Sequence, residues 1–135
     1  MSCNSAIYCV NTTSQSLLAN AQIPFGTIVR RFGRFVNLDG FGITLCGQGY
    51  YECNCSVTLE PAAIGNVSVQ LYLNGEPYPG AIATAYVATA DEPINLSFPA
   101  IIRVKGCEED TASTVMVRLG AAATIDNMAF TAKKI

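Results

Sequence analysis

The chain has 135 residues, of which half are hydrophobic and 13% are charged, and its formal net charge is −2. This length is typical of one domain that buries about 65% of its unfolded surface. Gly, Asn, Ser, Thr and Pro interrupt the apolar residues every few positions, so the sequence predicts no membrane insertion. The only basic cluster is Arg30, Arg31 and Arg34, which argues against a nucleic-acid partner and favours a solvated strand edge.

The start of the chain carries apolar side chains but no secretory signal pattern. It lacks a basic region followed by an apolar one, so export would need another route, such as cell lysis or deposition on an internal particle. Ile7, Tyr8 and Val10 would be exposed if this segment were free, so we expect them to pack against something. Residues 1–15 are therefore interpreted either as a first strand or as an extension that adds a strand to a neighbouring subunit. Residues 16–135 are expected to form the main domain.

Short segments with alternating apolar and polar residues follow one another along the chain, separated by turn residues. This spacing predicts an all-β protein built as an antiparallel sandwich. The Ala-rich segment 81–90 could be a helix, but its interleaved Thr and Val and the preceding Pro79-Gly80 favour a strand. The expected strands lie near residues 6–11, 16–24, 27–31, 34–38, 41–46, 49–59, 66–73, 80–89, 93–104, 113–119 and 123–131.

The clearest pattern is two successive strands, the second of which ends in a tight turn. Alternate positions of the segment 49–59 are apolar, and the segment 66–73 repeats this period. Asn74-Gly75 follows, and this dipeptide favours the positive φ angles of a two-residue hairpin. The first strand has one apolar face (Tyr51, Cys53, Cys55, Val57 and Leu59) and one polar face (Glu52, Asn54, Ser56 and Thr58). The block therefore predicts half-buried strands of an antiparallel sandwich, with a hairpin turn after the second strand.

The six cysteines fall into a core group and a group available for disulfides between subunits. The core group is Cys46, Cys53 and Cys55, and the second group is Cys3, Cys9 and Cys107. Cys53 and Cys55 lie two apart on one strand face, close to the distance limit for a disulfide, so they are interpreted as small hydrophobic residues. For the second group, the alternative is free thiols in a reducing compartment. Without histidine or a Cys-x-x-Cys spacing, no zinc site is expected.

The strand pair also carries a family resemblance. Gly49, Tyr51 and the next inward position resemble the Gly-x-Tyr-x-Phe hallmark of the tumour necrosis factor (TNF) and complement globular-head superfamily, with Cys53 where an aromatic residue usually lies. The segment 71–81 is similar to the matching hairpin of bacterial members, such as the C-terminal domain of collagen-like spore-surface glycoproteins. The Cys53 departure favours the bacterial or phage members over the vertebrate ones. The likeness spans residues 40–135.

The resemblance implies both a fold and an assembly. Members are antiparallel jelly-roll sandwiches that form homotrimers through one sheet of each protomer. For this chain it implies a TNF-like jelly roll and a homotrimer in which Tyr50, Tyr72 or Tyr86 line the three-fold contact.

The sequence offers little for catalysis. Without histidine, acid-base chemistry near neutral pH would depend on carboxylates, tyrosines, lysines or a cysteine without its usual base. The densest acidic run, 108–110, lacks the ligand spacing of a calcium loop. Gly47-Gln48-Gly49 lacks the helix that follows a phosphate-binding loop. We expect no enzyme activity, no cofactor and no metal.

These observations favour a non-enzymatic structural subunit that trimerises and stacks into an extracellular fibre or appendage on a bacterial spore or cell surface. The alternative is a phage virion protein, either a head decoration or a receptor-binding fibre tip. A third interpretation is a carbohydrate-binding module with Tyr78 as its aromatic ring, so a glycan or a host-surface receptor is also a candidate partner. If residues 1–11 connect subunits, their removal should leave folded trimers and abolish longer assemblies.

Overall fold

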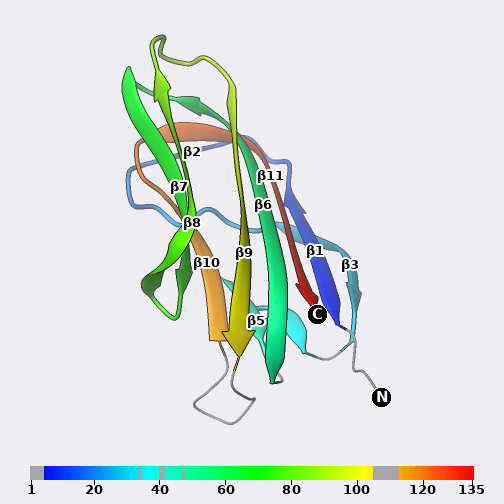
Figure 1. The fold of residues 1–135 in the computed structure, drawn as a ribbon. Coiled ribbons are helices and arrows are strands. Elements are labelled where there is room, and N and C mark those ends of the chain that lie inside the picture. The colour runs from blue at the N-terminus through cyan, green and yellow to red at the C-terminus, as the bar shows by residue number, and fades with distance from the viewer. Residues whose placement is uncertain (1–4, 34, 40–41, 47, 105–112) are drawn as a thin grey trace.

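The protein is a sandwich of two antiparallel β-sheets (Figure 1). The computed structural model describes residues 5–33, 35–39, 42–46, 48–104 and 113–135. The inward side chains of the two sheets fill a single hydrophobic core. No helix long and apolar enough to cross a membrane occurs in these ranges. The prediction of an all-β antiparallel sandwich is therefore confirmed.

Sheet A contains the strands from both ends of the described chain. Its order is β3-β1-β11-β6-β9, and β2 pairs with the start of β11. Its strands are β1 (Ala6–Asn11), β2 (Gln15–Leu17), β3 (Thr27–Phe32), β6 (Gly49–Pro61), β9 (Ile94–Val104) and β11 (Ala123–Lys134). In Figure 1, β1 and β11 run side by side, and β3 forms one edge of the sheet.

Sheet B has the order β4-β5-β10-β7-β8. Its strands are β4 (Val36–Asp39), β5 (Gly42–Leu45), β7 (Gly65–Leu73), β8 (Glu76–Val87) and β10 (Ser113–Leu119). The late strand β10 is inserted between β5 and β7, just as β11 of sheet A lies between β1 and β6. The insertion of a late strand between two earlier strands in each sheet is the pairing pattern of a jelly roll.

The two strands predicted for the segments 49–59 and 66–73 are present as β6 and β7, and they lie in different sheets. The apolar face of β6 is buried in the core from Tyr51 to Leu59, and its polar face points outward. β7 forms its hairpin with β8, and Asn74 (φ 53°) and Gly75 (φ 87°) supply the expected turn. Residues 81–87 of the Ala-rich segment lie in β8, as the interleaved Thr and Val indicated, and residues 88–90 form the following turn.

Two strand boundaries differ from the prediction by more than three residues. Only Gln15–Leu17 of the segment 16–24 is strand, because the chain turns at Asn20 (φ 67°) and crosses to sheet B, where Ile23 N–H donates to the Val117 carbonyl. β8 begins at Glu76 rather than near residue 80. An irregular register against β7 and a positive φ of 79° at Gly80 let the strand continue through its two prolines.

Cys53 and Cys55 are core residues, as predicted. Both side chains are buried, both thiols are free, and burial raises the pKa of each to about 12. Cys46 differs from the prediction, because it is half-buried after the end of β5 and its sulfur is not a free thiol. The alternation of apolar and polar residues along β6 predicts that Cys53 and Cys55 are buried. Cys46 lies beyond the end of β5, where this alternation does not apply.

The buried thiols predict that the fold weakens in alkali. An unfolded thiol ionises near pH 9, whereas folded Cys53 and Cys55 hold their protons to about pH 12. The folded state therefore binds more protons above pH 9, and its free energy of unfolding should fall by about 1.4 kcal/mol per pH unit for each thiol. Urea unfolding at pH 8, 9 and 10 measures this slope. The Cys55→Ala variant should have a shallower slope, and equal slopes for both proteins would contradict the assignment.

Candidate self-association surface

The outward face of sheet A is the most distinctive surface of the molecule. Antiparallel pairing aligns its outward side chains in rows across the strands. One row contains Tyr8 of β1, Thr131 of β11, Asn54 of β6 and Pro99 of β9, each directly opposite the next. Such cross-strand neighbours lie within side-chain contact distance, so each row acts as a continuous strip of surface.

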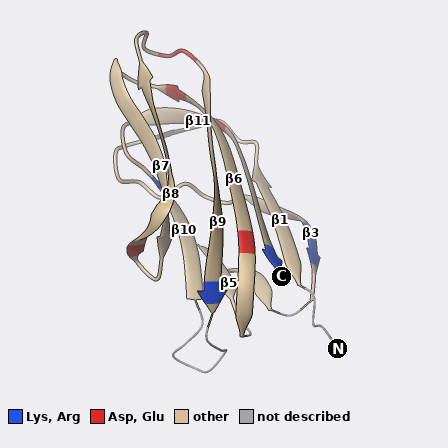
Figure 2. Ribbon diagram, viewed as in Figure 1, with Lys and Arg blue, Asp and Glu red and all other residues tan. Residues whose placement is uncertain are grey.

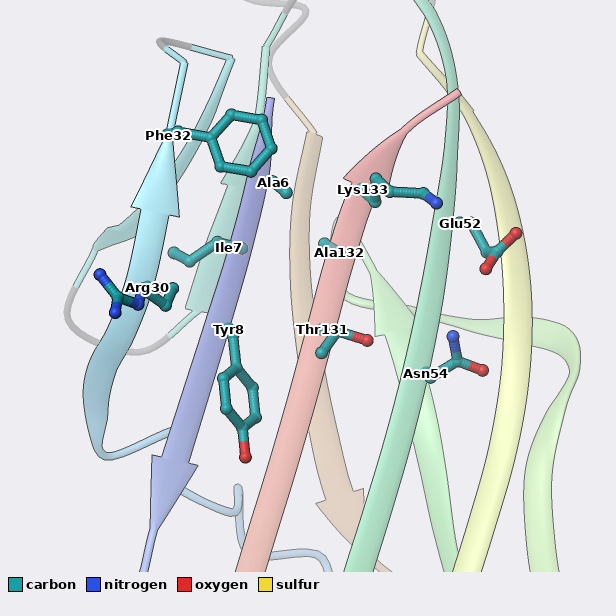
Figure 3. Close-up of a pocket in the computed structure, with 10 residues that line it drawn as sticks. All are labelled: Ala6, Ile7, Tyr8, Arg30, Phe32, Glu52, Asn54, Thr131, Ala132 and Lys133. Atoms are coloured by element: carbon teal, nitrogen blue, oxygen red, sulfur yellow. The ribbon is translucent and has the colours of Figure 1, made fainter. Parts of the chain in front are cut away.

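Two hollows lie next to each other on this face. The first, of about 320 Å³, lies between β1, β3 and β6 and crosses β11 (Figure 3). In Figure 3, Tyr8 and Arg30 lie on one side of it, and Glu52 and Asn54 lie on the other. The second hollow, of about 480 Å³, lies over β6, β9 and β11. Both are lined by Asn54 and Thr131, so together they form one depression, which we call the sheet A trough.

Small side chains form the floor of the second hollow. Ala129 of β11 lies opposite Ser56 of β6, and Ser56 lies opposite Ser97 of β9. Their short side chains leave space above the sheet that a larger residue would fill. The sequence predicts the polar face of strand 49–59, which includes the small Ser56. It does not predict that Ser97 and Ala129 lie beside Ser56.

Large apolar side chains surround the trough and are exposed. Phe32 on the β3 edge and Ile101 on the β9 edge are each 57% exposed, and Tyr8 and Tyr50 are also exposed. A soluble protein that places several such groups around one depression usually covers them with a partner. The arrangement therefore suits protein association better than it suits a solvated surface.

The charges on this face are of both signs. Figure 2 shows an acidic stretch on β6 with basic stretches on β3, β9 and β11 around it. Glu52 lies opposite Lys133 in the register, but within the described part of the chain it forms no ion pair. Its carboxylate is thus available to a cation on a partner. A surface with both signs of charge can be complementary to a second copy of itself.

The three tyrosines proposed for the three-fold contact do not share one surface. Tyr50 lies on the outward face of β6 in sheet A. Tyr72 and Tyr86 lie on β7 and β8 of sheet B, which faces away from the trough. Of the three, only Tyr50 can contribute to a contact made by the outward face of sheet A.

The proposed connector residues belong to the protomer's own sheet. Ile7, Tyr8 and Val10 lie in β1, which is hydrogen-bonded to β11 on one side and to β3 on the other. Ile7 is buried in the core, and Tyr8 contributes to the trough. The hypothesis that these residues add a strand to a neighbouring subunit is therefore wrong, because both edges of β1 are already paired within the protomer.

The prediction that Cys9 could form a disulfide between subunits is also wrong. Its side chain is 0% exposed, its thiol is free, and burial raises its pKa to about 11. A second chain could reach it only if the core opened. Cys3 and Cys107 lie outside the described residues, so they stay candidates on sequence grounds.

Other residues singled out by the sequence have structural roles or lie elsewhere. The Tyr78 hydroxyl donates a hydrogen bond to the Ile101 carbonyl at 2.6 Å, so its half-buried ring ties β8 to β9 rather than standing free for a sugar. Arg30 and Arg31 lie on the edge strand β3, as a solvated strand edge requires, and Arg34 is outside the described residues. The described ranges contain no group of three or more His, Cys, Asp or Glu that could hold a metal ion.

No family model matches the sequence, and no curated protein matches it significantly. Solved structures are similar to it in fold. Eiger TNF from S. frugiperda is 12% identical with a TM-score of 0.71, and the match covers 97% of this chain and 91% of that one. The globular domain of zebrafish complement 1qA is 11% identical with a TM-score of 0.66 and covers 94% of each chain. PRD1 vertex protein P5 is 15% identical with a TM-score of 0.66, covering 97% of this chain and 73% of its own. The chain has the TNF-like jelly-roll fold that the resemblance implied.

Proposed function

We propose that the chain is a non-enzymatic structural subunit that forms a homotrimer through the sheet A trough. The observation that carries this proposal is the trough itself, where exposed apolar groups surround a floor of small side chains. A partner that inserts side chains into this depression would also cover Phe32 and Ile101. The unpaired Glu52 among basic residues supports a second copy as the partner, because each copy brings charges of both signs.

The number of copies is proposed from the fold. The resemblance to the TNF and complement globular-head superfamily, whose fold this chain has, implies three copies. In an assembly with closed rotational symmetry, every protomer's association surface is in contact with a neighbour, so no apolar patch of that surface stays exposed. A trimer would thus cover the outward faces of three A sheets and expose the B sheets.

We further propose that trimers stack into an extracellular fibre on a bacterial spore or cell surface. Because β1 is committed to its own sheet, the stacking contact must lie elsewhere. Leu18 and Ile64 are 77% and 63% exposed, in the loops that follow β2 and β6. Leu18 and Ala62 line the same shallow hollow, so these two loops meet at one end of the sandwich. Two exposed aliphatic side chains at an end of the sandwich suit an axial contact between trimers.

Replacing both aliphatic residues should separate stacking from trimerisation. The Leu18→Glu, Ile64→Glu variant is expected to stay trimeric and to form no fibres, because buried carboxylates would oppose the axial contact. Negative-stain electron microscopy of wild type and variant tests this. The matched control is Asn66→Glu, Thr84→Glu, which adds the same charge to exposed positions on sheet B. Fibres in the first variant would contradict the stacking site.

The same microscopy, repeated under oxidising and reducing conditions, tests the role of the cysteines. Wild-type fibres that shorten after reduction would support a covalent lock between subunits, made by Cys3 or by Cys107. Fibres that persist after reduction would indicate that non-covalent packing alone holds the subunits together. Because Cys46 is not a free thiol, thermal unfolding of the reduced protein shows whether the protomer itself stays folded.

A virion protein is the second candidate. The observation in its favour is the similarity in fold to P5, a vertex protein of PRD1. A head decoration or fibre tip needs a trimer but no axial contact with other trimers. Isolated trimer-sized particles in both redox conditions would therefore favour this function over the fibre.

A further inference from the structure

A polar hollow of about 200 Å³ lies on the outward face of sheet B, away from the trough. Three of its lining residues form one row across the sheet. Arg118 of β10 lies opposite Gln70 of β7, and Gln70 lies opposite Ile82 of β8. Tyr72, Ser68 and Asn20 line the rest of it. A trimer built through sheet A leaves this face accessible.

Arg118 has an unusual environment for a half-buried arginine. Its guanidinium carbon lies 4.7 Å from the centroid of the Tyr72 ring, so the cation is stacked on an aromatic face. In the described part of the chain it has no carboxylate partner and donates no hydrogen bond. Stacking fixes the plane of the guanidinium and leaves the N–H groups at its edge free. Such a preorganised fork matches the two oxygens of a carboxylate.

The groups beside Arg118 also have hydrogen-bonding capacity to spare. The side-chain N–H₂ of Gln70 donates to the Leu71 and Tyr78 carbonyls, at 3.2 and 2.9 Å, which holds the amide in place and leaves its oxygen to accept. Gln22 is bridged directly opposite Arg118, although it does not itself line the hollow. Its Nε2 is buried and has no partner among the described residues. A buried donor of this kind calls for a water or ligand oxygen.

We propose that this hollow binds a carboxylate-bearing sugar, of the uronic acid type. The Arg118 fork takes the carboxylate, and the Gln70 amide oxygen and the Ser68 and Asn20 side chains take ring hydroxyls. Ile82, which is 45% exposed, provides an apolar wall for the C–H face of the ring. A hollow of about 200 Å³ accommodates one sugar ring rather than a long chain. On a structural subunit, this site would attach the sheet B surface to an acidic glycan.

Ligand-observed NMR with glucuronate and the full-length protein tests the proposal. Glucuronate should bind wild type at millimolar concentrations, more tightly than acetate, which lacks the ring, and than glucose, which lacks the carboxylate. Arg118→Gln should weaken binding by about 10-fold or more, because it removes a charge-assisted pair of hydrogen bonds. Arg118→Lys keeps the charge without the fork and should also weaken it. Arg103→Gln, which removes an exposed arginine of sheet A, is the matched control and should bind as wild type does.

Each alternative outcome would overturn the proposal. Equal binding of acetate and glucuronate would mean a simple anion site, and equal binding of glucose would mean that Arg118 is not the determinant. Unchanged binding in Arg118→Gln, with its thermal unfolding intact, would place the ligand elsewhere. The result is separable from self-association, because a protein that fails to trimerise still carries this hollow within one protomer.

Discussion

Deletion of residues 1–11 is expected to abolish the native fold. β1 pairs with β11 from Ala6 to Asn11 and with β3 on its other side, so its removal strips hydrogen bonds from both neighbours. Ile7 and Cys9 leave the core, and loss of one large aliphatic side chain alone costs about 1.5–3 kcal/mol. The lost backbone hydrogen bonds add roughly 0.5–1.5 kcal/mol each. Together these losses rival the whole stability of a small domain, about 5–15 kcal/mol.

Circular dichroism and thermal unfolding of the truncated protein measure this effect. We expect no cooperative transition and a strong tendency to aggregate, since β3 pairs only with β1 in its sheet and would detach with it. A truncated protein that melts cooperatively and stays trimeric would restore the interpretation of the first residues as a dispensable connector.

The substitution Ala129→Arg is expected to dissociate the trimer while leaving each protomer folded. Ala129 is half-buried on the outward face of β11 and lines the second hollow of the trough. An arginine there would place an unpaired charge within the contact, which costs about 3–5 kcal/mol when nothing compensates it. The association constant should fall about 100-fold or more. Size-exclusion chromatography with light scattering should then report single chains at micromolar concentration.

The matched control for this variant is Asn66→Arg. Asn66 is exposed on β7 of sheet B, and its replacement adds the same side chain to a face that the trimer does not use. This control should keep the wild-type mass, and both variants should keep the wild-type melting temperature within a few degrees. Dissociation of the control, or a trimeric Ala129→Arg, would place the contact on another surface.

Local patterns in the sequence were sufficient for much of the fold. The period of two in 49–59 requires that alternate residues face the core, which is why the burial of Tyr51, Cys53 and Cys55 could be predicted. Asn74-Gly75 tolerates positive φ angles, so the β7–β8 hairpin could be placed to the residue. The Gly49 and Tyr51 motif led to the TNF-like jelly roll.

Long-range pairing could not be predicted from these patterns. The alternation in β1 is the same whether its backbone bonds to β11 of its own chain or to a neighbour, so the connector hypothesis was open until the register was known. The alternation of side chains along a strand likewise predicts that Tyr50 and Tyr72 point outward. It does not predict that they lie on different sheets. The trough and the Arg118 hollow both combine strands distant in sequence, so neither forms a local motif.

Sedimentation equilibrium of the wild-type protein, over a range of concentrations and at physiological salt, tests the central claim most directly. We predict a mass three times the 14.3 kDa of the single chain, maintained down to low micromolar concentration. A mass of one chain throughout that range would contradict the proposal that the sheet A trough is a surface for self-association.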